Sequence, residues 1–204
     1  MITPDAKLVV RAPLRASMNY IEKLVRDKNG WITRKIAEIS QKPVSRPKEF
    51  ADGEEFLFLG NRYPLCIRDN RSGGIELREK LYVPLRTGPE LERLLTAWYQ
   101  TQARKIFCER CDAFSKVIGR KPTTIRLSSA QKRWGSCSTS GTVSLSWRLI
   151  FAPPEIIDYV IVHEFVHILH HNHSTKFWDT VRSFMPDYQR RRDWLKFHEK
   201  MLVL

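Results

Sequence analysis

VIVHEFVHILHHNHSTKFW, residues 160–178, holds five of the six histidines of this 204-residue chain. Inside it lies an H-E-x-x-H pentapeptide, His163 to His167, with apolar residues on both sides. On an α-helix, residues four apart lie about 40° apart around the axis and roughly 6 Å along it. His163 and His167 therefore share a face and can bind one metal ion. Glu164 is rotated by about 100° from His163, which holds its carboxylate off the metal but within reach of a metal-activated water, where a general base belongs.

A catalytic zinc normally takes three protein ligands and leaves one position for water, so a third ligand is needed. His170 lies on the same helical face but a further turn along, too far from a metal held by the first two histidines. His173 can reach the metal if the helix ends near His171 and Asn172, with Asn172 in the left-handed conformation that asparagine tolerates at a helix end. Ser174 is then predicted to be the N-cap of the next helix.

The pattern therefore predicts a catalytic Zn²⁺ site with Glu164 as general base and with three ligands, His163, His167 and His173. The alternative is a segment that buffers metal loosely, because H-E-x-x-H occurs by chance in unrelated helices and histidine-rich tracts bind metals without catalysis. The apolar residues around the ligands, the third histidine at a workable spacing and the helix-breaking residue before it favour the catalytic site.

Four further segments, together with the H-E-x-x-H motif, form a pattern that resembles a known family. They are QKRWGSCS at residues 131–138, the strand-like residues 143–150, NHS at 172–174 and FW at 177–178. With these segments the chain resembles the YgjP-like metallopeptidases, relatives of the SprT-like zincins. The resemblance is specific over residues 127–195 and looser before them. It implies a zincin-like fold, hydrolysis of peptide bonds, zinc bound by the same three histidines and Glu164 as the catalytic carboxylate.

The charge of the chain is strongly basic, with 35 Lys and Arg against 22 Asp and Glu, a formal net charge of +13. The excess lies in residues 1–50, with 11 basic and 5 acidic side chains, and in residues 101–150, with 10 and 2. The second segment leads into the predicted metal helix. A basic surface beside the site predicts an anionic substrate or partner, such as a nucleotide or nucleic acid. The alternative is a solvated surface that only keeps the protein soluble.

The cysteines and the hydropathy pattern predict a cytoplasmic protein. Four cysteines, among them the pair Cys108 and Cys111, do not make a disulfide framework in a chain of this length. The C-x-x-C pair falls in a predicted helix without a second pair, so we interpret it as two thiols on one helical face. No apolar run reaches the roughly 18 residues of a membrane span, and the first residues lack the pattern of a signal peptide. No membrane partner is expected.

Hydrophobic periodicity predicts an α+β fold, a zincin-like domain with a small antiparallel sheet and an N-terminal helical and β extension. The domain boundary is placed between residues 87 and 88, with a helical and β-hairpin region at 1–87 and the metal-binding domain at 88–204. Helices are predicted at residues 17–25, 31–39, 89–118, 155–171, 177–184 and 187–201. Strands are predicted at residues 7–11, 56–59, 62–67, 74–78, 80–83, 123–128 and 144–149, and a linker at 42–47.

The last predicted strand, residues 144–149, alternates polar and apolar residues as a sheet edge with one buried face does. In zincins such a strand borders the active-site cleft, where substrate can add as an extra strand. Before it lies the polar loop at residues 131–137. Trp134 in this loop could simply cover the core. The functional alternative puts Arg133 or Lys132 near the metal, where a cation would stabilise the oxyanion that forms when water attacks.

Three functions therefore stay open on the sequence. The leading one is a zinc metallopeptidase that acts on peptides. The second is a metal-dependent hydrolase of nucleotide phosphoanhydrides, since a metal, a base and surrounding Arg and Lys also serve that chemistry. The third is a zinc-stabilised module that binds nucleic acid without catalysis.

Overall fold

The computed structural model describes residues 1–204 except 4–5, 44–46, 70–72 and 87. The chain divides into two compact units, Met1–Val44 and Ser45–Leu204. This division falls at a different place from the domain boundary predicted between residues 87 and 88, which stays a prediction. Among the described residues, no helix has both the length and the hydropathy needed to cross a membrane.

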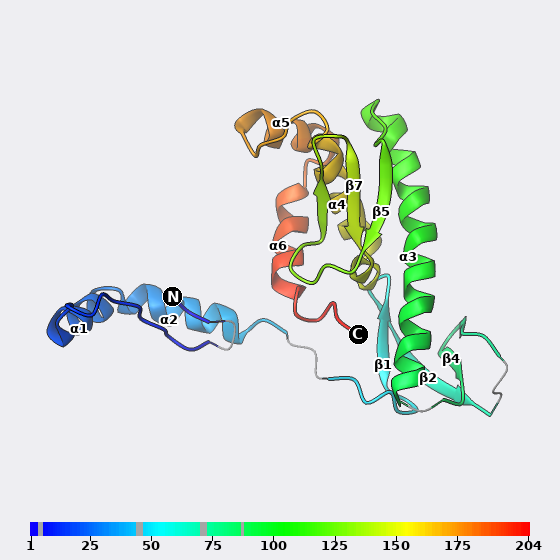
Figure 1. The fold of residues 1–204 in the computed structure, drawn as a ribbon, viewed down its shortest axis with the longest axis horizontal. Helices are drawn as coiled ribbons and strands as arrows, with labels where there is room; N and C mark the ends of the chain where they lie inside the picture. The colour runs from blue at the N-terminus through cyan, green and yellow to red at the C-terminus, as the bar shows by residue number, and fades with distance from the viewer. Residues whose placement is uncertain (4–5, 44–46, 70–72, 87) are drawn as a thin grey trace. The chain divides into compact units, whose positions relative to one another are not determined.

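The first unit is built from two helices, α1 (Met18–Asp27) and α2 (Asn29–Ser40) (Figure 1). Ser17 caps α1, because its Oγ accepts a hydrogen bond from the backbone N–H of Tyr20 at 3.3 Å. The strand predicted at residues 7–11 is wrong, since the described part of this segment has only an isolated bridge between Ile2 and Leu8. Both predicted helices are confirmed, whereas the linker predicted at 42–47 falls partly outside the described residues.

The second unit begins with a four-stranded sheet. Its strands are β1 (Glu55–Phe58), β2 (Asn61–Arg68), β3 (Glu76–Leu77) and β4 (Leu81–Pro84), in the order β1-β2-β4-β3. The strands were predicted correctly, but the prediction that the sheet is antiparallel is wrong for one pair, because β2 and β4 run parallel. The reason is that β3 takes the edge and forms a hairpin with β4, which inserts β4 beside β2 in the parallel direction.

A second sheet has three strands, β5 (Thr124–Ser128), β6 (Gly135–Cys137) and β7 (Thr142–Ser146), in the order β5-β7-β6. The strand predicted at residues 144–149 is thus central rather than an edge, and it ends at Ser146, where the 3-10 helix η1 (Trp147–Phe151) begins. The physical reason is that part of the predicted loop at 131–137 forms β6, which pairs with β7 and becomes the edge itself.

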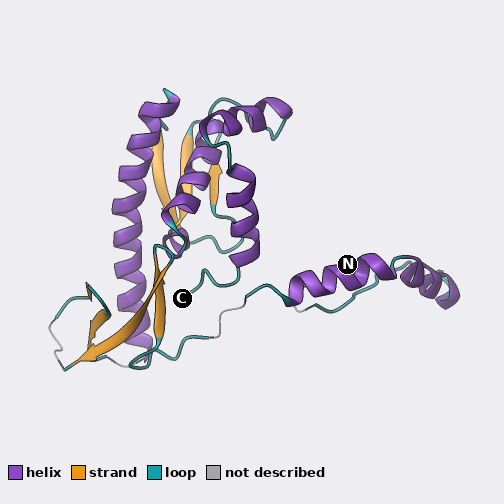
Figure 2. Cartoon of the chain, turned by 180° about the vertical axis from the view of Figure 1, so that it is seen from behind, coloured by secondary structure: helices purple, strands orange, loops and turns teal. Residues whose placement is uncertain are grey.

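Four α-helices complete the described part of this unit, and the α+β class is confirmed. They are α3 (Gly88–Ile118), α4 (Pro154–Val166), α5 (Thr175–Phe184) and α6 (Tyr188–His198). Figure 1 shows α3 running the length of the unit, alongside β5 at one end and β2 and β4 at the other, and Figure 2 gives the view from behind. The end of α3 at residue 118 was predicted correctly, and Gly119, with φ +70°, follows it as a C-terminal glycine.

The core of the second unit surrounds α4. Nine of its thirteen residues are buried, because α3, α5, α6 and the strands β6 and β7 contact it from several sides. Tyr99 on α3 is fully buried and its hydroxyl donates a hydrogen bond to the carbonyl oxygen of Leu57 at 2.9 Å, which links α3 to β1. The H-E-x-x-H motif therefore sits on the most enclosed helix of the unit, a rigid support for a site.

Candidate metal centre

Three histidines converge at the end of α4. His163, His167 and His173 each offer a ring nitrogen, and these atoms all lie within 4.8 Å of one another. The Nε2 atoms of His163 and His173 are 3.1 Å apart. A tetrahedral zinc with Zn–N bonds of ~2.0–2.1 Å separates its nitrogen ligands by about 3.3 Å. The spacing of these two imidazoles therefore fits one bound zinc ion.

The chain brings His173 to this cluster by a different route from the predicted one. The helix ends at Val166, earlier than predicted. The turn that follows is tight, since the N–H of Ile168 donates to the Phe165 carbonyl and that of Leu169 to the Val166 carbonyl, each at 3.0 Å. The prediction of a left-handed Asn172 is wrong, because Asn172 is not among the residues with positive φ. The chain therefore reaches His173 through this turn and the bend at residues 171–172, without a left-handed residue.

A backbone carbonyl orients His167. Its Nδ1 lies 3.0 Å from the carbonyl oxygen of His170, and since the carbonyl can only accept, Nδ1 carries the proton. Nε2 is then the unprotonated nitrogen that is able to bind a metal. The His170 ring lies outside the three-histidine group and contacts the Thr180 hydroxyl at 3.2 Å through Nε2. Sequence reasoning missed this supporting role of His170, because a backbone carbonyl leaves no mark in the sequence.

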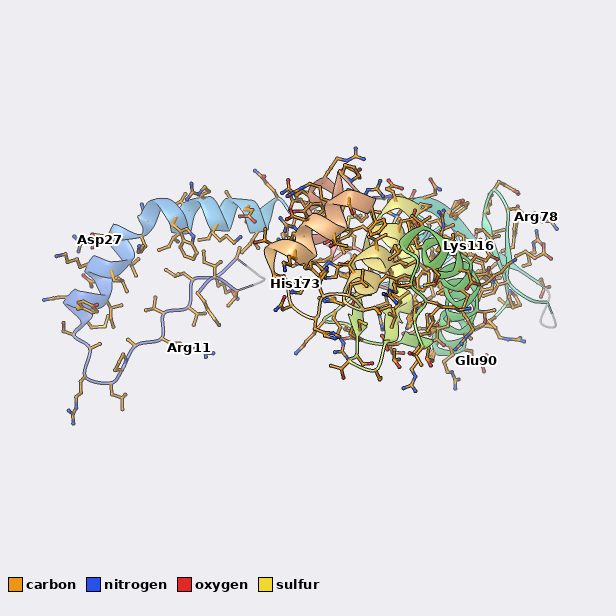
Figure 3. All side chains as sticks on the ribbon, turned by 90° about the horizontal axis from the view of Figure 1, so that it is seen from above. Arg11, Asp27, Arg78, Glu90, Lys116 and His173 are labelled. Atoms are coloured by element: carbon orange, nitrogen blue, oxygen red, sulfur yellow. The ribbon has the colours of Figure 1, made fainter. Side chains whose placement is uncertain are left out.

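An aromatic wall holds the three imidazoles together. The ring of Phe177, which is fully buried, contacts the rings of all three histidines, with centroid distances of 5.0, 4.5 and 4.7 Å. Trp178 stacks on His173 at 5.5 Å and on Tyr188 at 5.3 Å. Both residues belong to the first turns of α5, which begins after Ser174 as predicted. Figure 3, the view from above, labels His173. The side chains behind the ligands thus come from α5 and α6.

The environment of His163 and His167 favours the neutral imidazole, the form that binds a metal. Burial, reinforced by the neighbouring His167 and His173, lowers the pKa of His163 to about 3. Burial also lowers the pKa of His167. The Nδ1 atom of His163 is buried and has no hydrogen-bond partner among the described residues. Imidazole nitrogens that converge on one point are a donor set that suits zinc, so the residues present fit the ion.

Glu164, the residue after His163 on α4, lies against Gly135 of β6. Its side chain is only 6% exposed. Burial raises the pKa of this carboxyl to about 7, while the positive charge of Arg133 opposes the rise. Burial and the nearby Glu164 also raise the pKa of the Cys137 thiol. A carboxyl with a pKa near neutrality can both take up and return a proton at physiological pH.

The turn before β6 contains both cation candidates, Lys132 and Arg133, and both are exposed. The positive charge of Arg133 acts to lower the pKa of Glu164, so Arg133 lies within electrostatic reach of this carboxyl. Trp134 packs against the core while remaining half-buried. The two interpretations of this loop are thus compatible, since Trp134 covers the core and Arg133 lies within electrostatic reach of Glu164.

The cysteines are separate from the metal centre. All four are free, and none belongs to the three-histidine group among the described residues. Cys108 is exposed on α3 whereas Cys111 is buried, and burial raises the pKa of Cys111 to about 12. A thiol with so high a pKa is unreactive at neutral pH.

Comparison with known proteins identifies one family. A family model described as "YgjP-like, metallopeptidase domain" matches residues 1–198. No curated protein matches the chain. Among solved structures, the chain is similar to the metallopeptidase zymogen of Pyrococcus abyssi abylysin, with 19% identity over 44% of this chain and 90% of that one and a TM-score of 0.41. It is also similar to the metallopeptidase zymogen of Methanocaldococcus jannaschii jannalysin, with 16% identity over 48% and 97% and a TM-score of 0.41.

Proposed function

Because the chain belongs to the YgjP-like metallopeptidase family and is a metal-dependent hydrolase, we propose that it hydrolyses peptide bonds with zinc as its metal. His163, His167 and His173 are the proposed ligands, and Glu164 is the proposed general base. The observation that carries this proposal is the convergence of three ring nitrogens within 4.8 Å of one another, at the end of the helix that also carries a buried carboxyl of raised pKa.

The chain's own residues account for the proton transfers. When bound, zinc lowers the pKa of water to about 7 and polarises a carbonyl oxygen. A carboxylate oxygen of Glu164 accepts the proton of the attacking water and afterwards donates it to the nitrogen of the leaving amine. A pKa of about 7 suits both steps. Arg133 is proposed to stabilise the oxyanion that develops on the substrate. The carbonyl of His170 keeps His167 in the tautomer that leaves Nε2 free for the ion.

An edge strand beside the site supports a peptide substrate. β6 lies at the edge of its sheet and contacts α4. Ser146 donates its N–H to the Trp134 carbonyl at 2.8 Å, and Ser138 donates to the Thr142 carbonyl at 2.9 Å. By the alternation of an antiparallel ladder, the N–H and C=O groups of Gly135 then point to the free edge. An extended peptide can pair with such an edge as a further strand.

A nucleotide is the second candidate substrate, and the charge of the chain favours it. Residues 101–150 carry 10 basic and 2 acidic side chains, and Arg133 acts on the proposed base. Phosphoanhydride hydrolysis uses a metal with cations around the phosphates. The same excess supports nucleic acid as a partner. For the compartment we propose the cytoplasm, since free cysteines fit a reducing environment.

The test is hydrolysis of an unstructured protein and of nucleoside triphosphates by the wild type and by Glu164→Gln, at low and high salt. We expect proteolysis that Glu164→Gln lowers by roughly 10²–10⁴-fold while zinc content is retained. Arg133→Ala should lower the rate more than Lys132→Ala. Salt-sensitive triphosphate cleavage that needs Glu164 and Arg133, without proteolysis, would replace the peptidase by the nucleotide hydrolase. Retained proteolysis in Glu164→Gln would remove Glu164 from the mechanism.

A further inference from the structure

Gly135, the first residue of β6, lies directly against the side chain of Glu164. A Cβ atom at position 135 would be 2.6 Å from Cγ, 2.6 Å from Oε1 and 2.8 Å from Cδ of Glu164. Non-bonded carbon atoms in contact normally lie about 3.5–4.0 Å apart. The backbone of β6 therefore occupies the space beside Glu164 so closely that not even a methyl group fits between them.

The need for glycine at this position is one of space and not of backbone conformation. Gly135 is not among the glycines with positive φ, so an L-residue could adopt its backbone angles without strain. Gly74 offers a matched comparison, because its φ is also not positive and a Cβ there would meet nothing within 4 Å. Substitution by alanine should therefore be harmless at Gly74 and should cause a clash at Gly135.

The strand β6 cannot easily move away to relieve the clash. The segment around Gly135 is tied to β7 on both sides, by the hydrogen bonds that link Ser146 to Trp134 and Ser138 to Thr142. Movement of β6 would strain or break these bonds. The Glu164 side chain is the part that is able to give way.

If the Glu164 side chain moves to relieve the clash, its carboxylate moves with it. One of the atoms that would clash is Cγ, and only the first side-chain torsion moves Cγ. Rotation about the outer bonds therefore leaves that contact in place. A helical residue has few other χ1 positions, because one of the three staggered wells collides with the preceding turn. A change of χ1 carries the carboxylate away from its present place.

We propose that Gly135 is a positioning residue: because position 135 has no side chain, the Glu164 carboxylate has space to occupy its catalytic position. The proposal rests on the proposed function of Glu164 as general base. Gly135 acts through Glu164, by excluded volume, and binds neither the metal nor the substrate through a side chain. A methyl group at 135 displaces the base without touching the three histidines.

The experiment compares Gly135→Ala with Gly74→Ala, in the wild type and in a Glu164→Ala background, by zinc content, kcat, KM and Tm. Gly135→Ala should keep its zinc and lose kcat by about 10²-fold or more, toward the roughly 10²–10⁴-fold of general-base loss, with KM changed little. Gly74→Ala should match the wild type. The Tm of Gly135→Ala should fall by roughly 2–12 °C in the wild type and stay unchanged in Glu164→Ala, where the clashing atoms are gone.

Two results would overturn the proposal. An equal fall of Tm in both backgrounds would mean that the clash involves groups other than Glu164. Retained kcat in Gly135→Ala, with Glu164→Gln inactive, would mean that the base tolerates the methyl group. If Gly135→Ala is too unstable to purify, the double variant with Glu164→Ala should still fold, and its failure would also refute the idea. If the proposed function itself is wrong, the results differ. Glu164→Gln would then stay active, while Gly135→Ala would still lower Tm in the wild type and leave it unchanged in Glu164→Ala.

Discussion

Replacement of Glu164 by glutamine should stabilise the metal-free protein at alkaline pH. The carboxyl is 6% exposed, and burial raises its pKa from the ordinary 4.5 to about 7. Folding therefore favours the protonated form. Below pH 4.5 the carboxyl is protonated in both the folded and the unfolded chain, and this favourable contribution is fully present. As the pH rises toward 7 the unfolded chain loses its proton first, so the contribution is progressively lost.

The size of the effect follows from the two pKa values. A pKa difference of one corresponds to about 1.4 kcal/mol, so the change from 4.5 to about 7 corresponds to about 3 kcal/mol of free energy of unfolding. Glutamine has no such proton to lose. Relative to its value at pH 4.5, the stability of Glu164→Gln should therefore exceed that of the wild type by about 3 kcal/mol at pH 8.

The assay is urea unfolding of both metal-free proteins at several values between pH 4.5 and pH 8, with the difference between them plotted against pH. Other titrating groups cancel in this difference, because both proteins contain them. Any constant effect of the amide is removed by using the pH dependence alone. A difference that does not change with pH would refute the reasoning, since it would mean that Glu164 is ionised as easily in the folded protein as in the unfolded one.

Three further predictions concern the ligands and their support. His173→Ala should lose most of the bound zinc, whereas His171→Ala, a change at an exposed neighbour, should keep it. Elemental analysis of the purified variants measures this, and a fully loaded His173→Ala would disprove the ligand assignment. Phe177→Ala should lower the free energy of unfolding by about 3–5 kcal/mol and weaken zinc affinity, measured by urea unfolding and by competition with a chelator; unchanged zinc affinity would mean that the aromatic wall does not orient the histidines. Removal of zinc by a chelator should lower Tm and abolish hydrolysis, with both restored by added zinc; activity that survives complete removal of metal would contradict a metal-dependent mechanism.

Much of the fold could be predicted from the sequence because local patterns determine it. The long apolar stripe of α3 and its end at Gly119, the caps Ser17 and Ser174, and the short strands between residues 55 and 84 all follow from periodicity and turn residues. The pairing of these strands could not be predicted in the same way. The direction of β4 depends on β3 taking the sheet edge, and the residue pattern within each strand does not say which strand becomes its neighbour.

The candidate site, too, could be predicted only where local spacing determines it. His163, Glu164 and His167 follow from the sequence, because a helix converts their spacing into a shared face. His173 could be proposed from its distance along the chain, but the turn that delivers it was wrongly predicted, since its hydrogen bonds depend on where α4 ends. Only the tertiary structure decided the surroundings, because burial and contact arise between segments far apart in the chain. These surroundings are Phe177 against all three imidazoles, and Gly135 and Arg133 beside a carboxyl whose pKa is raised by its burial.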